Sequence, residues 1–166
     1  MAYKVFNKGL INRYGKKFEE KSIYSLDTSE RELKFGNNGY GYHYVDYLED
    51  GLRYFDGMNE EIDIATVYPL GDVVESFDDY YGYYNMYVTD KIYIDHVLNR
   101  NEIIDYALDL SIPKAERFIT GYKLNDYEKE LFEKCYHDPH IDKAIDYYQN
   151  HNMDAYNTPK VLKKVR

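Results

Sequence analysis

The sequence predicts an α+β protein, with a mostly antiparallel sheet in the N-terminal two thirds and helices segregated at the C-terminus. Two observations carry this prediction. Short β-rich runs, set apart by Asn, Gly and Lys residues, fill the first 98 residues, and after them apolar residues recur at helical spacing. We therefore expect a β-rich domain over residues 1–98 with one short helix, and a helical region over residues 99–166 that packs on it.

Within the first region, apolar and polar residues alternate from Ile62 to Tyr68, which predicts a strand that Pro69 ends. Further β-rich runs predict strands at 2–6, 22–26, 71–77, 85–89 and 91–95. The stretch 78–84 would then be a hairpin tip or an edge. Glycine and asparagine at 36–39 predict a turn, and apolar residues spaced three or four apart from Val45 to Phe55 predict a helix that Gly57 closes.

In the last third, the apolar spacing predicts a helix from Asn101 to Leu110. A second helix is expected to start at Pro113 and to end at Gly121, since proline suits a first turn and glycine an end. Asn125 followed by Glu128 is typical of a capping box. The pair Asp138–Pro139 predicts the start of another helix, and Thr158–Pro159 a last turn before a basic tail.

The acidic excess of the chain is concentrated in one segment. The net charge is −9, and residues 59–95 hold nine acidic residues against one lysine, a net charge of −8. Residues 1–58 balance nine acids with nine bases, and residues 96–166 carry twelve acids and eleven bases. A single-sign surface repels nucleic acid and attracts basic partners. We expect no direct binding of nucleic acid through the central segment.

Composition also limits where the protein acts. Cys135 is the only cysteine, so no internal disulfide can form, which argues against a secreted disulfide-built domain. No signal peptide is visible and no apolar stretch is long enough to span a bilayer, so we expect a cytoplasmic protein without a membrane partner. AT-rich codon usage is one explanation for the 22 tyrosines, but it does not explain why they cluster.

The cluster of tyrosine and acid favours a protein-interaction surface. Tyrosine gives contact area at low entropic cost, and neighbouring carboxylates pair with Arg and Lys of a partner. The expected partner-binding residues are Asp72, Glu75, Asp78, Asp79, Tyr80, Tyr81, Tyr83, Tyr84 and Asp90. The simpler alternative is a sheet whose tyrosines pack on the core while its acids face water. Adjacent tyrosines point to opposite faces, so Tyr80 and Tyr81 cannot both be buried in that way.

Several short motifs follow one another in the first region: Ala2-Tyr3-Lys4-Val5-Phe6, Gly41-Tyr42-His43, Gly71-Asp72-Val73-Val74-Glu75 and Lys91-Ile92. In order and rough spacing they resemble a family of small uncharacterised phage and bacterial domains. The family pattern is an A-Y-K-x-F opening, a central G-[FY]-H and a later acidic strand pair, and it covers about residues 2–98. Tyr44 and Val45 stand where the family has a cysteine, which weakens any metal or His/Cys interpretation. The resemblance implies no activity, but it suggests a phage or mobile-element origin.

The favoured hypothesis is thus a non-enzymatic module that binds or inhibits a basic, nucleic-acid-binding host protein such as a defence effector, acting as a nucleic-acid mimic. An alternative is an enzyme similar to ADP-ribosyltransferases, with His43 and Glu75 in one cleft and a nicotinamide dinucleotide as substrate. A structural histidine is the competing explanation for His43. A third hypothesis is an assembly component, which leaves homo-oligomers open.

No cofactor and no metal is expected. His137, Asp138, His140 and His151 invite a metal interpretation, but Pro139 favours a cap and turn, and no matched second pair completes a ligand set. The chain also lacks phosphate-loop, nucleophile-elbow, zinc-protease and dinucleotide-binding motifs.

Overall fold

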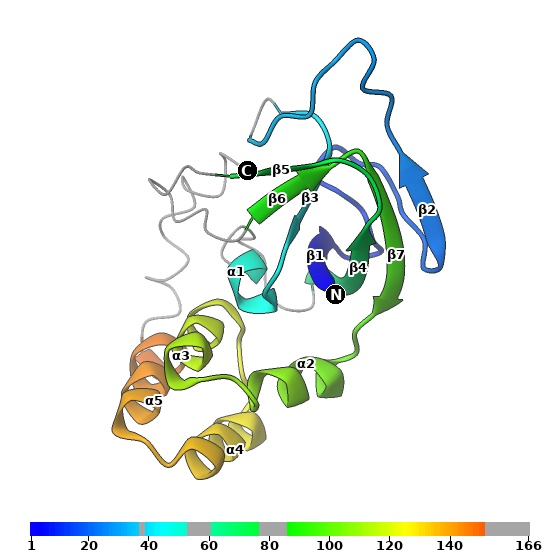
Figure 1. Ribbon diagram of the computed structural model, residues 1–166. Helices are drawn as coiled ribbons and strands as arrows, with labels where there is room; N and C mark the ends of the chain where they lie inside the picture. The colour runs from blue at the N-terminus through cyan, green and yellow to red at the C-terminus, as the bar shows by residue number, and fades with distance from the viewer. Residues whose placement is uncertain (37–38, 53–60, 77–85, 152–166) are drawn as a thin grey trace. The chain divides into compact units, whose positions relative to one another are not determined.

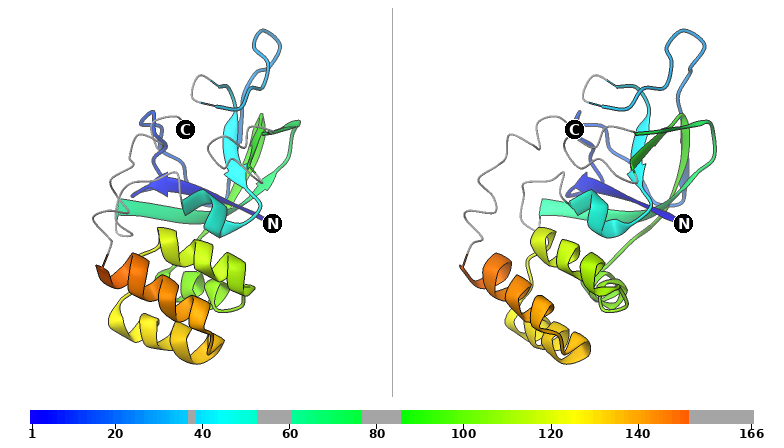
Figure 2. Two further views of the ribbon diagram at one scale, coloured as in Figure 1. Left: turned by 90° about the vertical axis from the view of Figure 1, so that its left-hand side faces the viewer. Right: turned by 60° about the vertical axis from the view of Figure 1, so that its left-hand side comes forward.

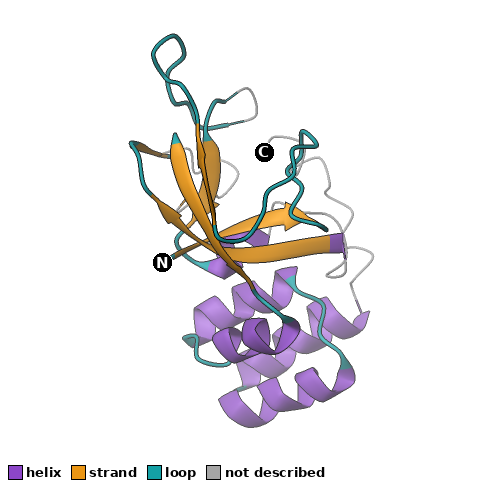
Figure 3. Cartoon of the chain, turned by 90° about the vertical axis from the view of Figure 1, so that its right-hand side faces the viewer, coloured by secondary structure: helices purple, strands orange, loops and turns teal. Residues whose placement is uncertain are grey.

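The computed structural model describes residues 1–36, 39–52, 61–76 and 86–151. These residues form two compact units, of which the first is Met1–Leu98 and the second begins at Asn99, the boundary that the change of sequence pattern indicates. Strands lie in the first unit and, apart from one short helix, the helices lie in the second (Figure 3). No helix within the described ranges combines the length and the apolar character needed to cross a membrane.

The first unit is built on a seven-stranded antiparallel sheet, which confirms the predicted fold class (Figure 1). The strand order is β2-β7-β4-β1-β3-β6-β5. The bounds are β1 Ala2–Asn7, β2 Ser22–Ser25, β3 Tyr42–Val45, β4 Ile62–Pro69, β5 Val73–Glu75, β6 Met86–Thr89 and β7 Lys91–Val97. Every predicted strand is present, while the hairpin tip predicted at 78–84 lies outside the described residues.

A long, bent two-stranded ribbon forms much of this sheet. Its chain runs up through β4 and β5 and returns through β6 and β7, with β4 paired to β7 and β5 paired to β6. The bend falls at Gly71 and Asp90, where the Asp90 carboxylate accepts a hydrogen bond from the Asp72 N–H at 2.9 Å. A side chain at residue 71 would collide with that carboxylate, which explains the glycine. The bend makes β6 a neighbour of β3, and β7 a neighbour of β2.

One hydrophobic cluster of the first unit lies on one face of the curved sheet. It consists of Ala2, Phe6, Leu10, Phe18, Tyr42, Tyr44, Ala65, Val67, Ile92 and Ile94. Phe6 and Phe18 are completely enclosed, with ring centroids 5.3 Å apart. Burial of two such side chains stabilises the fold by about 1.5–3 kcal/mol each.

The short helix of the first unit is shorter than predicted. Val45 belongs to β3, and helix α1 covers only Leu48–Leu52. The prediction placed Val45 on the apolar stripe of the helix because its spacing fits. β-Branched residues favour strands, and Val45 is instead the last residue of β3. Helix α1 lies beside β1 (Figure 2), and Gly51 permits the close approach, since a side chain there would press on Val5. The predicted helix end at Gly57 lies outside the described residues.

The second unit contains α2 Arg100–Ala107, α3 Ile112–Gly121, α4 Asp126–Tyr136 and α5 Pro139–Ala144, which continues into a π-helical segment, Ile145–His151. The predicted capping box is confirmed: Asn125 accepts from the Glu128 N–H, and Glu128 accepts from the Asn125 N–H. Glu128 also receives two hydrogen bonds from Arg100, at 2.7 and 2.6 Å. The predicted last turn at 158–159 lies outside the described residues.

Candidate functional site

The structure describes three of the nine expected partner-binding residues. Asp72 and Glu75 are exposed on and beside β5, the last strand of the sheet. Asp90 is half-buried, and its carboxylate accepts the hydrogen bond at the bend of the ribbon, so it has a structural role. The other six lie outside the described residues: Asp78, Asp79, Tyr80, Tyr81, Tyr83 and Tyr84.

Part of the acidic charge of residues 59–95 is neutralised in the structure. Asp63 forms an ion pair with Lys8 at 3.2 Å and accepts hydrogen bonds from two backbone N–H groups. Asp95 pairs with Lys21 at 2.7 Å, and this bond holds the pKa of the Asp95 carboxyl below its usual value. Both lysines come from residues 1–58. The tertiary fold therefore neutralises part of a charge that a segment count leaves unopposed.

The structure does not bring His43 and Glu75 into one cleft, so the pairing expected for an ADP-ribosyltransferase-like site is wrong. His43 lies opposite Val88, and Val88 lies opposite Val74. Glu75 belongs to the neighbouring row, opposite Tyr87, which in turn faces Tyr44. Because successive residues of a strand point to opposite faces, the His43 and Glu75 side chains lie on opposite faces of the sheet.

The His43 side chain connects β3 to the loop before it. Its Nε2 atom accepts a hydrogen bond from the Gly36 N–H at 3.3 Å, and its ring packs on Phe35 at 5.1 Å. Burial, helped by the nearby Lys4 charge, lowers the pKa of His43 to about 4. The ring is therefore neutral at physiological pH, and its acceptor nitrogen is already occupied.

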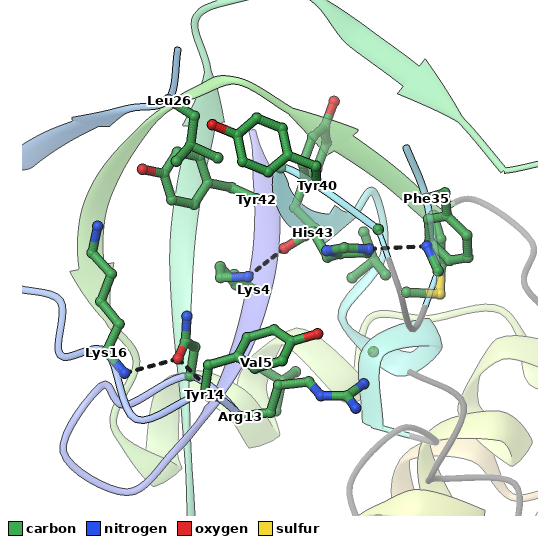
Figure 4. A pocket seen from close by; sticks show the side chains of 18 of the residues that line it. Lys4, Val5, Arg13, Tyr14, Lys16, Leu26, Phe35, Tyr40, Tyr42 and His43 are labelled. Atoms are coloured by element: carbon green, nitrogen blue, oxygen red, sulfur yellow. Dashed lines mark hydrogen bonds between the residues drawn. The ribbon is translucent and has the colours of Figure 1, made fainter. Parts of the chain in front are cut away.

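A cavity of about 640 Å³ opens where β1 and β3 separate (Figure 4). Their pairing is limited to Tyr3 opposite Val45. Beyond that pair the wall is completed by residues from 12–16, 31–36 and 39–41 and by β3 itself. Four cationic side chains line the cavity, Lys4, Arg13, Lys16 and Arg31, and none of the described lining residues is an Asp or a Glu.

Lys4 lies in the gap between the two strands. Its ammonium group donates to the His43 carbonyl oxygen at 2.7 Å, in the place of the strand-to-strand bond that β1 does not supply (Figure 4). It forms no ion pair with a carboxylate of a described residue, and burial lowers its pKa to about 8. An ammonium group has three donors, and the bond to the His43 carbonyl uses one of them.

The loops hold the remaining cations in place. The Asn12 side-chain oxygen accepts from the Lys16 N–H at 2.9 Å and closes a tight turn. The Lys16 ammonium then sits over three aromatic rings, those of Phe18, Tyr24 and Tyr42, with centroids 5.2–5.8 Å away. Arg31 stacks on the Tyr40 ring at 4.6 Å. Both cations are exposed at the cavity rim, and neither is paired with a carboxylate in the described part of the chain.

The Tyr42 hydroxyl is an unusual feature of the cavity wall. Tyr42 is only 6% exposed, and its hydroxyl has no hydrogen-bond partner among the described residues. A buried polar group without a partner costs about 1–3 kcal/mol. Gly41, just before it, adopts φ +133° and lies against Val88, so this turn into β3 requires glycine. The backbone thus fixes Tyr42 where its hydroxyl stays unsatisfied.

The sequence analysis missed this cationic site. Its residues come from segments far apart in the chain, and residues 1–58 as a whole are neutral. One signal was present: alternation along β1 places Lys4 on the same face as Ala2 and Phe6, two core residues. A lysine on the apolar face of a strand indicates a special role for its charge. The two motifs around Lys4 and His43 meet at the Lys4–His43 hydrogen bond.

Around the C-terminal histidines the described residues offer no metal site. Asp138 caps α5 by accepting from the His140 N–H at 2.8 Å, and the His140 ring lies 3.3 Å from the same carboxylate. No group of three or more His, Cys, Asp or Glu residues in the described ranges is arranged to hold a metal ion. Cys135 is exposed on α4.

Comparison of the chain with protein-family models, curated protein sequences and solved structures finds no match.

Proposed function

We propose that the first unit is a binding module that holds a small anionic ligand in the cavity between β1 and β3. The observation that carries the proposal is the segregation of charge. In a chain with a net charge of −9, four cationic residues line one cavity without an acidic residue among its described lining. Cations gathered in a concave site attract anions and hold them with charge-assisted hydrogen bonds.

Lys16 and Arg31 provide the direct test of anion binding. We expect inorganic pyrophosphate to bind the wild-type protein in isothermal titration calorimetry, and the double variant Lys16→Gln/Arg31→Gln to bind it about 10–100-fold more weakly, since the two lost charged contacts together cost about 1.4–2.8 kcal/mol. Affinity should also fall as salt is added.

Lys17 supplies the matched control, because it is an exposed neighbour of Lys16 that does not line the cavity. Lys17→Gln should bind pyrophosphate within about twofold of wild type. Equal weakening by Lys17→Gln and by the double variant would point to a diffuse charge effect and would contradict the proposal, as would the absence of any pyrophosphate binding.

A second candidate function is docking of a basic protein partner on the edge of β5. Every residue from Leu70 to Glu75 is exposed, including Leu70 at 49%, Val73 at 45% and Val74 at 37%. β5 is the last strand of the sheet, and no strand of the described residues pairs with its outer side, where a partner strand could be added. Asp72 and Glu75 favour a partner strand with Lys or Arg residues.

The docking candidate is tested by photo-crosslinking in a lysate of the cell in which the protein acts. A crosslinking residue at Val74 should capture one defined basic protein, and the same residue at Ile23 on β2, the opposite sheet edge, should not. Charge reversal by Asp72→Lys/Glu75→Lys should abolish capture, whereas Glu130→Lys/Glu133→Lys on α4 should leave it intact. Equal capture from both edges, or capture that survives reversal at β5, would exclude this surface.

A further inference from the structure

We propose that Lys4 holds the ligand of the cavity covalently, as a Schiff base between its Nζ atom and an aldehyde or ketone group of the ligand. This inference rests on the proposed function, in which the ligand is an anion, and narrows the ligand to anions that carry a reactive carbonyl. It follows from the place of one lysine in the cavity wall and from the contacts of its nitrogen (Figure 4).

The Lys4 nitrogen has a defined position and no acidic partner. Lys4 is half-buried and belongs to the cavity lining, so a ligand in the cavity lies against it. The hydrogen bond to the His43 carbonyl oxygen, at 2.7 Å, holds the nitrogen in the gap between β1 and β3. No carboxylate of a described residue forms an ion pair with it. An ion pair would keep the nitrogen protonated, and a protonated amine is not a nucleophile.

Burial makes this amine reactive near neutral pH. It lowers the pKa of Lys4 to about 8, against 10.5 for an ordinary lysine. At pH 7 roughly one molecule in ten then has the neutral amine, against about one in three thousand for an ordinary lysine. Only the neutral amine carries the lone pair that attacks a carbonyl carbon. Because the His43 carbonyl accepts an N–H of Lys4, the lone pair is directed away from that oxygen.

Schiff-base formation is balanced between the amine and the ligand. The nitrogen lone pair forms the new C–N bond, and the electron pair of the carbonyl double bond moves to oxygen, which takes up a proton. The resulting carbinolamine loses water, so both protons of the neutral amine leave with the carbonyl oxygen. When the C=N nitrogen is protonated from solvent, it again has an N–H that can donate to the His43 carbonyl.

The rest of the lining suits a small organic anion. Val5, Phe35 and Tyr40 are among the lining residues and offer surface on which the carbon frame of a ligand can pack. Arg13 and Arg31 belong to the same lining and attract negative charge. The cavity volume of about 640 Å³ lies in the range typical of sites for small organic molecules, roughly 300–1,000 Å³.

Reductive trapping tests the inference on the wild-type protein. It is incubated at pH 7 with a limiting amount of 4-carboxybenzaldehyde, an anionic aldehyde, and with sodium cyanoborohydride, which reduces a Schiff base to a stable amine. Peptide mass spectrometry then gives the labelling rate of each lysine. Lys4 should be labelled at least about tenfold faster than Lys17, because its neutral fraction is far larger than that of an ordinary lysine.

Lys17 is the matched reference, since it is exposed and does not line the cavity. Excess pyrophosphate should slow the labelling of Lys4 at least about fivefold, by occupying the anion site, and should leave that of Lys17 within about twofold. Benzaldehyde lacks the carboxylate, so the ratio of the Lys4 rate to the Lys17 rate should be smaller with benzaldehyde than with 4-carboxybenzaldehyde.

The outcomes separate the two proposals. Binding of pyrophosphate in calorimetry, with Lys4 labelled no faster than Lys17, overturns the Schiff base and leaves the anion-binding function standing. A lysine that only bridges β1 and β3 gives this result. Fast labelling of Lys4 that excess pyrophosphate does not slow separates the lysine from the anion site and also overturns the inference, while calorimetry decides whether the proposed function stands. Slow labelling without pyrophosphate binding overturns both.

Discussion

Replacing Lys4 by methionine is expected to weaken the binding of pyrophosphate in the cavity while changing the free energy of unfolding at pH 7 by less than about 1 kcal/mol. The Lys4 ammonium group lines the cavity and would donate to the anion, and loss of a charged hydrogen bond costs about 1.5–3 kcal/mol, or roughly 10–100-fold in affinity. Titration calorimetry with pyrophosphate measures the difference.

The free energy of unfolding of the wild-type protein should depend on pH because Lys4 carries a buried charge. Burial lowers its pKa to about 8, against 10.5 for an ordinary lysine. Between these values the unfolded chain binds a proton that the folded chain does not, so the free energy of unfolding rises with pH. The wild-type protein should gain about 2 kcal/mol from pH 8 to pH 10. Above pH 10 Tyr44 acts in the opposite sense, since burial raises its pKa to about 12.

Lys4→Met removes that pH dependence together with the cost of the buried charge, and it leaves the His43 carbonyl without its donor. These two effects are of similar size at pH 7, so the free energy of unfolding should change by less than about 1 kcal/mol. Denaturant unfolding at pH 7, 8, 9 and 10 measures both curves. A variant whose profile parallels that of wild type would show that Lys4 is not the group that titrates.

Acidification is expected to destabilise the first unit through His43. Its pKa is lowered to about 4 by burial and by the Lys4 charge, against 6.5 for an ordinary histidine. Between pH 6.5 and pH 4 the unfolded chain takes up a proton that the folded chain excludes. Stability is therefore fully present above pH 6.5 and is lost as the pH falls to 4, by about 3 kcal/mol.

The His43→Gln variant isolates this contribution. Its amide oxygen can accept the Gly36 N–H bond, but it does not titrate. The stability difference between wild type and variant should shift by about 3 kcal/mol toward the variant from pH 7 to pH 4. His140→Gln on α5 is the control, because His140 is exposed and lies outside the first unit. Equal shifts for both variants would rule out burial of His43 as the cause.

Local signals were sufficient for most of the secondary structure. Alternation at Ile62–Tyr68 gave a strand, and the Asn125/Glu128 pair gave a capped helix start, because each depends on neighbours within a few residues. The helix predicted to start at Val45 began too early because that prediction also considered only neighbouring residues. Its spacing fits a helix stripe, but pairing of Val45 with Met86, 41 residues later in the chain, commits it to β3.

Charge and site depended on contacts between distant segments. The count of −8 over residues 59–95 is correct as composition, but Asp63 and Asp95 are paired with Lys8 and Lys21, more than fifty residues earlier in the chain. The His43/Glu75 pair was reasonable by residue type. The β3-β6-β5 register, which no local pattern specifies, places the two side chains on opposite faces.

The sequence by itself thus determined the α+β class, six of the seven strands, the Asn125 helix cap and the change of pattern after residue 98, all of which follow from short-range patterns. Only the tertiary structure decided where charge accumulates. The separation of β1 from β3 after one residue pair places Lys4 in a gap, and two loops add Lys16 and Arg31 beside it. The physical reason is that a cavity is a property of strand spacing and loop closure, and neither is encoded within a window of neighbouring residues.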